Sequence, residues 1–310
     1  MVTENYAPGA AERMGLSYER FKQVKPDIIM CSLSGYGQTG PFSRHVSYGA
    51  LLGGQSGLVS LSGYAEDGIP RDPGTSYGDP ILGMFALLAI NTALVHRART
   101  GDGQYIDVSM YEAMEMILPE ALLEYAVSGR EPRPMSNHDL LMSPHNCYKA
   151  RGGAEDWVAI AAGSEQEWQA LCGAIGQPAL GDDPRFRTAA LRKRNEAELD
   201  RIITQWTSER DRWEITELLQ RAGVAAFPTL SNKDLAHDRH LRERGYLVEL
   251  EHPEVGKRIH AGIPWTMSGT PCKVWRAAAL LGQDTDYLLS SLLGYSPEKI
   301  AELRASEILY

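Results

Sequence analysis

The sequence predicts an α/β fold that combines a larger domain, built on a mainly parallel sheet, with a smaller α/β domain. Strand and helix patterns alternate over residues 1 to about 140, and such alternation is typical of a parallel sheet with helices on both faces. A stretch with two prolines and one glycine, 128–136, then interrupts the alternation as a linker would. Beyond it, apolar residues recur at helical spacing in a second set of elements.

Five elements are predicted in the larger domain from the spacing of their apolar residues. They are a helix over 17–24, a strand over 27–33, a helix over 80–97, a strand over 105–109 and a helix over 111–127. The third is the best marked, because Pro80 suits a first helical position and Asp79 before it is able to accept hydrogen bonds from the free amides of the first turn.

The smaller domain is predicted to contain a strand over 157–161 and helices over 165–175 and 195–206. Residues 207–211 open a further helix that ends at Ala222 and Gly223, and Ser231 begins a short capped helix. The apolar residues of these helices are interpreted as core. Two more helices are expected over 285–293 and 297–305.

These patterns divide the chain into three parts. We predict that residues 1–135 form the first part of the larger domain, that 136–255 form the smaller domain, and that 256–310 return to the larger domain.

Asp79 stands at the mouth of an almost wholly apolar helix. Local sequence favours a structural role as the N-cap, and the alternative is a functional acid held at a buried edge. Glycine-rich segments precede it at 34–41 and 48–57. Glycine at this density lets the backbone approach a ligand closely, or simply makes turns, and the sequence leaves both interpretations open.

Composition indicates a globular metabolic protein. The chain has 310 residues, of which 43% are hydrophobic, and a formal net charge of -9. The apolar fraction suffices for a large core, and the negative charge disfavours nucleic-acid binding. The one basic run, 191–194, sits among acids and is interpreted as a solvated helix face.

The cysteines and histidines show no metal-binding pattern. Cys31 and Cys172 lie in apolar surroundings and are predicted to be reduced core residues. His237 and His240 are three residues apart but lack a third ligand, so no metal cofactor is predicted.

No signal peptide or membrane span is predicted. Charge and proline interrupt residues 2–10, and the apolar helix 81–95 is judged too short for a span and contains Gly83 and Asn91. A cytoplasmic location without membrane association is therefore the expectation.

Several ordered motifs resemble the class III CoA-transferases, a family that includes formyl-CoA transferase, carnitine CoA-transferase and the α-methylacyl-CoA racemases. The matching stretches are 4–9 with 13–15, 32–37, 78–79 with 83–84, 100–104, 235–238, 268–271 and 280–286. They span nearly the whole chain. The resemblance implies a Rossmann-like large domain, a smaller α/β domain and two subunits interlocked as linked rings, hence a homodimer.

In this family the acid of the Gly-Asp pair is the nucleophile, and Asp79 matches it. The resemblance implies transfer of coenzyme A from an acyl-CoA donor to a small carboxylic acid through an aspartyl-CoA thioester. An ionised carboxylate needs no base to act as a nucleophile at neutral pH. Asn5, Tyr6, Arg13 and Met14 match the residues that contact CoA, which makes CoA the expected cofactor.

Three departures from the family pattern qualify the expectation. Relatives carry a segment before the turn at Asn5, so we expect an upstream segment or a second chain to complete the fold. The racemase branch has a His-Asp pair where Tyr48 and Gly49 stand, so a racemase ranks behind a transferase. Many transferases have an acid at the position of Gly49, and formyl-CoA transferases carry a longer glycine loop than 150–153, so oxalate or formate is not the expected acceptor.

The alternative function is a truncated or partner-dependent subunit that keeps the fold and is not catalytic by itself. No local motif encodes the acyl donor or the acceptor acid. The resemblance to the family suggests a dicarboxylic acyl-CoA, such as succinyl-CoA, as the donor.

Overall fold

The computed structural model describes residues 1–309. Contacts divide the chain into two compact units. Unit 1 comprises Met1–Arg151 and Val158–Phe227, and unit 2 comprises Gly152–Trp157 and the chain from Pro228 onward. The domain boundaries predicted after residues 135 and 255 stay predictions.

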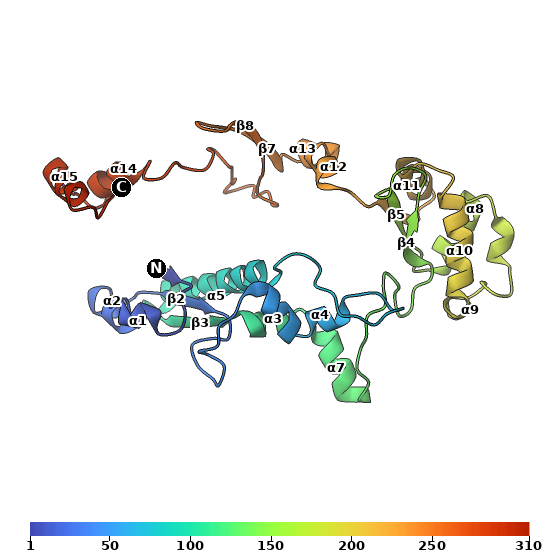
Figure 1. The fold of residues 1–310 in the computed structure, drawn as a ribbon, viewed down its shortest axis with the longest axis horizontal. Helices are drawn as coiled ribbons and strands as arrows, with labels where there is room; N and C mark the ends of the chain where they lie inside the picture. The colour runs from blue at the N-terminus through green and yellow to red at the C-terminus, as the bar shows by residue number, and fades with distance from the viewer. Residues whose placement is uncertain (310) are drawn as a thin grey trace. The chain divides into compact units, whose positions relative to one another are not determined.

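Unit 1 contains a three-stranded parallel sheet in the order β1 (Val2–Glu4), β2 (Met30–Ser34), β3 (Tyr105–Ser109) (Figure 1). The central strand β2 is buried along almost its whole length, which is expected of a parallel strand covered on both faces. The predicted mixed α/β fold with a parallel sheet is therefore confirmed. β3 has its predicted bounds, whereas β2 begins after a turn in which Ile28 donates to the carbonyl of Lys25.

Helix α5 (Gly78–Thr100) lies along β2 and β3 (Figure 1). The residues that it buries recur every three or four positions, as one face of a helix requires. They are Gly78, Ile81, Leu82, Ala86, Ile90 and Ala93. Gly101 ends the helix in the left-handed conformation with φ 84°. Gly103 then passes so close to the backbone of Asp27 and Ile28 that no Cβ fits there.

The apolar helix was judged too short to span a membrane. That judgement is wrong, because α5 has 23 residues rather than the 15 of segment 81–95. By length and composition this helix is able to cross a membrane, and 33% of its apolar window is buried inside the protein. Core helices of soluble proteins pass the same test.

The predicted helix over 111–127 is two helices, α6 (Met110–Glu115) and α7 (Pro119–Ser128). Pro119 has no N–H to donate and disfavours helical backbone at the preceding residue, so it starts a new helix instead of continuing the old one. The predicted helix over 17–24 is confirmed as α2 (Tyr18–Val24), capped by the Ser17 hydroxyl.

Shorter helices fill the connections of this region. They are α1 (Ala10–Arg13), α3 (Gly49–Gln55) and α4 (Leu58–Leu61).

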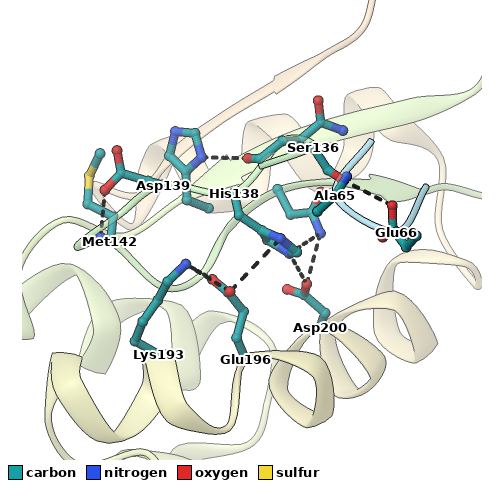
Figure 2. A network of polar contacts seen from close by, with 12 residues as sticks. Ala65, Glu66, Ser136, His138, Asp139, Met142, Lys193, Glu196 and Asp200 are labelled. Carbon is teal, nitrogen blue, oxygen red and sulfur yellow. Dashed lines mark hydrogen bonds and ion pairs between the residues drawn. The ribbon is translucent and has the colours of Figure 1, made fainter. Parts of the chain in front are cut away.

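The predicted linker is anchored by polar contacts near its end. The Ser136 hydroxyl accepts a hydrogen bond from the Ala65 amide at 2.9 Å and donates to Glu66 at 3.3 Å. Figure 2 shows this contact beside a second one, in which His138 lies 2.9 Å from Asp200. The segment between α7 and the next strand is thus tied down although it has no regular structure.

The rest of unit 1 packs helices around a small sheet in the order β4 (His145–Lys149), β5 (Trp157–Ala161), β6 (Ala225–Pro228). The helices are α8 (Glu165–Ala174), α9 (Ala189–Arg194), α10 (Glu196–Thr207) and α11 (Arg212–Arg221), with a 3₁₀ turn η1 (Pro178–Gly181). Leu199, Ile203 and Trp206 are in the core as predicted, together with Trp168, which is fully buried. Ile202 packs against it.

Unit 2 contains short elements. They are α12 (Asn232–Ala236), α13 (Arg239–Glu243), β7 (Leu247–His252), β8 (Gly256–Ala261), α14 (Thr285–Tyr287), η2 (Leu288–Leu292) and α15 (Pro297–Ala305). The predicted cap at Ser231 is confirmed as a capping box with Asp234. β7 and β8 pair as an antiparallel hairpin, which the sequence analysis did not predict.

All four cysteines are free, and Cys31 and Cys172 are buried as predicted. Burial raises the pKa of the Cys31 thiol to about 11 and that of Cys172 to about 12, so both thiols stay protonated at neutral pH.

Candidate active site

A cavity of about 1070 Å³ opens at the carboxyl-terminal edge of the β1–β2–β3 sheet. The turn after β1, the loop after β2 and the first residue after β3 line it, because parallel strands all end at the same edge. Open α/β sheets bind ligands at this edge. The position of the cavity therefore favours a ligand site.

Asp79 lines this cavity from the first turn of α5, and the residue is exposed. The expectation of an acid at a buried edge is wrong in that respect. The N-cap interpretation is also wrong: the Ile81 amide already donates to the Tyr77 carbonyl at 3.2 Å, so Tyr77 is the N-cap and Asp79 lies inside the helix. The carboxylate is thus not occupied by helix capping.

The Asp79 carboxylate accepts a hydrogen bond from the Ser76 hydroxyl at its Oδ2 atom. Gly49, the first residue of α3, packs directly against this pair. A Cβ at position 49 would overlap both the Ser76 Oγ and the Asp79 Oδ2. The acid is therefore held between a hydroxyl and a glycine backbone, and its other oxygen, Oδ1, has no hydrogen bond within the described residues.

Three of the four residues for which the resemblance implies CoA contacts line the same cavity. Asn5 and Tyr6 belong to the turn after β1, and Arg13 ends α1. The turn is held by a 2.8 Å hydrogen bond from the Tyr6 amide to Glu4 and by Gly9, whose φ is 76°. The fourth residue, Met14, is exposed and lies outside the lining.

Two further basic residues in the lining were missed by the sequence analysis. Arg44 and His45 come from the loop between β2 and α3, and both are exposed. Arg13 and Arg44 give the cavity two guanidinium groups that are able to bind phosphates or carboxylates, and Glu12 and Asp79 are acids of the same lining. The sequence signal that could have identified Arg44 and His45 was their position a few residues before Tyr48 and Gly49.

Ser76 was also missed, although it stands three residues before Asp79. That spacing is the one at which a hydroxyl often caps a helix, and the sequence alone does not reveal that it contacts a side chain instead.

A second cavity, of about 950 Å³, lies along α7 and the predicted linker and contains none of the predicted site residues. In residues 1–309 no group of three or more His, Cys, Asp or Glu side chains is arranged to hold a metal ion.

The comparisons with known proteins agree with one another. The family model for CoA-transferase family III matches residues 1–285. The chain is 32% identical over 309 residues to succinyl-CoA:glutarate CoA-transferase of Mus musculus, covering 100% of this chain and 70% of that protein. It is 31% identical over 328 residues to formyl-CoA:oxalate CoA-transferase of Bradyrhizobium diazoefficiens, covering 100% of this chain and 76% of that protein.

Among solved structures, a CAIB/BAIF family protein from Brucella suis superposes with a TM-score of 0.83 and 28% sequence identity. The superposition covers 94% of this chain and 75% of that protein. The family match, the curated relatives and the shared fold lead to one conclusion: the chain belongs to CoA-transferase family III and is a CoA-transferase.

Proposed function

We propose that this enzyme transfers coenzyme A from an acyl-CoA to a carboxylic acid through a covalent aspartyl-CoA thioester on Asp79. The observation that carries the proposal is the placement of Asp79. Its carboxylate is exposed, free of helix capping and part of the same cavity wall as Asn5, Tyr6 and Arg13.

The reaction begins when the Asp79 carboxylate attacks the thioester carbonyl of the donor. The C–S bond breaks, and a mixed anhydride and the CoA thiolate result. The thiolate then attacks the aspartyl carbonyl, the donor acid leaves as a carboxylate, and aspartyl-CoA remains. The acceptor carboxylate repeats both steps in reverse order, which returns Asp79 to its ionised form. Two acyl exchanges replace one difficult displacement.

The binding part of the proposal assigns CoA to the side of the cavity formed by Asn5, Tyr6 and Arg13. A guanidinium binds phosphate oxygens in a fixed fork, so Arg13 is proposed to contact a CoA phosphate. We retain Met14 among the proposed contacts because it directly follows Arg13 and its side chain is exposed.

For the donor we propose a dicarboxylic acyl-CoA such as succinyl-CoA. The support comes from the names of relatives: one is a succinyl-CoA:glutarate CoA-transferase, and another, at 30% identity, is the succinyl-CoA–D-citramalate CoA-transferase of Chloroflexus aurantiacus. The two guanidinium groups in the cavity lining, those of Arg13 and Arg44, suit a donor with a second negative group.

The test is to incubate the protein with succinyl-CoA, trap the adduct with hydroxylamine or borohydride, and locate it by peptide mass analysis. Asp79 is expected to carry the modification. Asp79→Asn removes the nucleophile and is expected to abolish both adduct and exchange. Its folding stability should stay within about 0.5 kcal/mol of the parent because no cap is lost.

Asp72→Asn is the matched control, since Asp72 is a nearby exposed acid outside the cavity lining. It should leave the adduct intact. A folded parent protein that gives no Asp79 adduct with any acyl-CoA of a succinyl, glutaryl, formyl and acetyl series would contradict the proposal. That result would favour a partner-dependent subunit without activity of its own.

A further inference from the structure

We propose that Ser76 is the hydrogen-bond donor that orients Asp79 and stabilises the oxyanion formed whenever the aspartyl carbonyl is attacked. The proposal rests on the proposed function, and it adds a residue to that site.

The hydrogen bond from Ser76 reaches the carboxylate that is proposed to react. The Ser76 hydroxyl donates to Oδ2 of Asp79, and both residues line the cavity. Over residues 1–309 this is the one hydrogen bond that reaches the Asp79 carboxylate. It leaves Oδ1 as the oxygen available for attack on a thioester.

The contact is not helix capping. A capping serine accepts a hydrogen bond from the amide three residues later, as Ser164 does from Glu167 at the start of α8. At the start of α5 no side chain caps the helix, and Ser76 instead donates to the side chain of Asp79. The helix end therefore does not require the hydroxyl.

Gly49 holds the donor against the acid. Because a Cβ there would overlap both Ser76 and Asp79, the space of a side chain is filled by the hydrogen-bonded pair. The pair is consequently constrained on the side of α3, which restricts the orientations open to the carboxylate. Such preorganisation lets a donor act without rearrangement when charge develops.

The chemistry gives the hydroxyl a function in each half-reaction. After Oδ1 has formed the anhydride, Oδ2 is the carbonyl oxygen of the aspartyl group. When the CoA thiolate adds to Cγ, the electron pair of the C=O bond moves onto Oδ2, and the hydrogen bond from Ser76 strengthens. The pair returns as the donor carboxylate leaves, and the Ser76 proton stays on Ser76 throughout. The same oxygen becomes negative when the acceptor attacks aspartyl-CoA.

The experiment measures two single-turnover rates: formation of aspartyl-CoA from succinyl-CoA without acceptor, and its discharge by an added carboxylic acid. Ser76→Ala is expected to lower both rates about 10²-fold, the usual effect of losing one oxyanion donor. KM for succinyl-CoA should change by no more than about twofold, because the hydrogen bond acts on the transition state and not on binding.

Two variants separate this function from a structural one. Ser76→Thr keeps the hydroxyl and is expected to restore most of the lost rate. Ser60→Ala is the matched control, since the Ser60 hydroxyl donates to the Gly57 carbonyl at 2.7 Å and Ser60 lies outside the cavity lining. It should behave as the parent.

Wild-type rates in Ser76→Ala, or equal losses in the Ala and Thr variants, would overturn the proposal while the Asp79 adduct of the parent still supports the proposed function. Absence of any Asp79 adduct in the parent protein would overturn both. The two failures are therefore distinguishable.

Discussion

The environment of Arg192 differs from the one that its sequence pattern predicted. The basic run 191–194 was interpreted as a solvated face, yet Arg192 is 1% exposed. Its guanidinium donates to Glu165 at 2.7 Å and to the carbonyls of Ser143 and Phe186, and it lies over the Trp168 ring. The interpretation was wrong for this residue because a long side chain is able to reach partners from distant segments, which local charge patterns do not reveal.

The ion pair makes part of the folding stability depend on pH. The hydrogen bond from Arg192 lowers the pKa of Glu165 below its ordinary value of 4.5. Ionised Glu165 therefore stabilises the folded state above pH 4.5, and this contribution is lost as the pH falls through the lower folded pKa.

We accordingly expect Glu165→Gln to be less stable than the parent at neutral pH, with the difference shrinking below pH 4.5. Urea unfolding at a series of pH values measures it. A constant difference between Glu165→Gln and the parent across the acid range would contradict the expectation.

At the scale of elements, glycines with different surroundings should respond differently to the same change. Gly103 packs on the backbone of Asp27 and Ile28. The methyl group that Gly103→Ala adds must therefore displace either the segment before β2 or the segment before β3. We therefore expect Gly103→Ala to lower the free energy of unfolding by about 2 kcal/mol.

Gly83 is the matched comparison, because it lies inside α5 with no atom in the way of a Cβ. Gly83→Ala should raise stability by roughly 0.5–1 kcal/mol, the helix-interior difference between the two residues. Thermal or urea unfolding measures both variants, and a destabilisation of similar size in each would show that the packing at Gly103 is not the cause.

Element boundaries were predictable where a residue carried its own signal. Ser17 and Ser231 cap their helices by local hydrogen bonds, and both helices appear where they were expected. The start of α5 was placed two residues late because Asp79 and Pro80 resemble an N-cap and N1 pair, whereas the helix begins at Gly78, which packs against Met110. The sulfur of Met110 would lie 2.7 Å from a Cβ at position 78, so Gly permits this close approach.

At the scale of the whole molecule, apolar side chains remain exposed on two helices. On α5 they are Met84, Leu87, Leu88 and Val95, and on α7 they are Leu122, Leu123 and Val127. Surfaces of this kind usually mark an interface between proteins. This agrees with the homodimer that the resemblance implies, which we put forward as a proposal.

Sedimentation equilibrium is expected to give the mass of two chains. Leu88→Glu and Leu123→Glu together should shift the protein toward the monomer, because they place charges in an apolar contact. Arg99→Glu, at an exposed polar position of α5, serves as the control and should leave the mass unchanged. A parent protein that is monomeric at all concentrations would contradict the proposal.

The sequence by itself determined the alternation of strand and helix, the helices that follow Ser17 and Ser231, and the family. The first two depend on hydrogen bonds and apolar spacing within a few residues, and the family depends on short motifs spread along the chain. Only the tertiary structure decided that Asn5, Arg13 and Asp79 share one cavity and that Ser76 contacts the acid beside Gly49. Those contacts join segments far apart in the chain, and they form only when the carboxyl ends of parallel strands meet at one edge and α3 packs against α5.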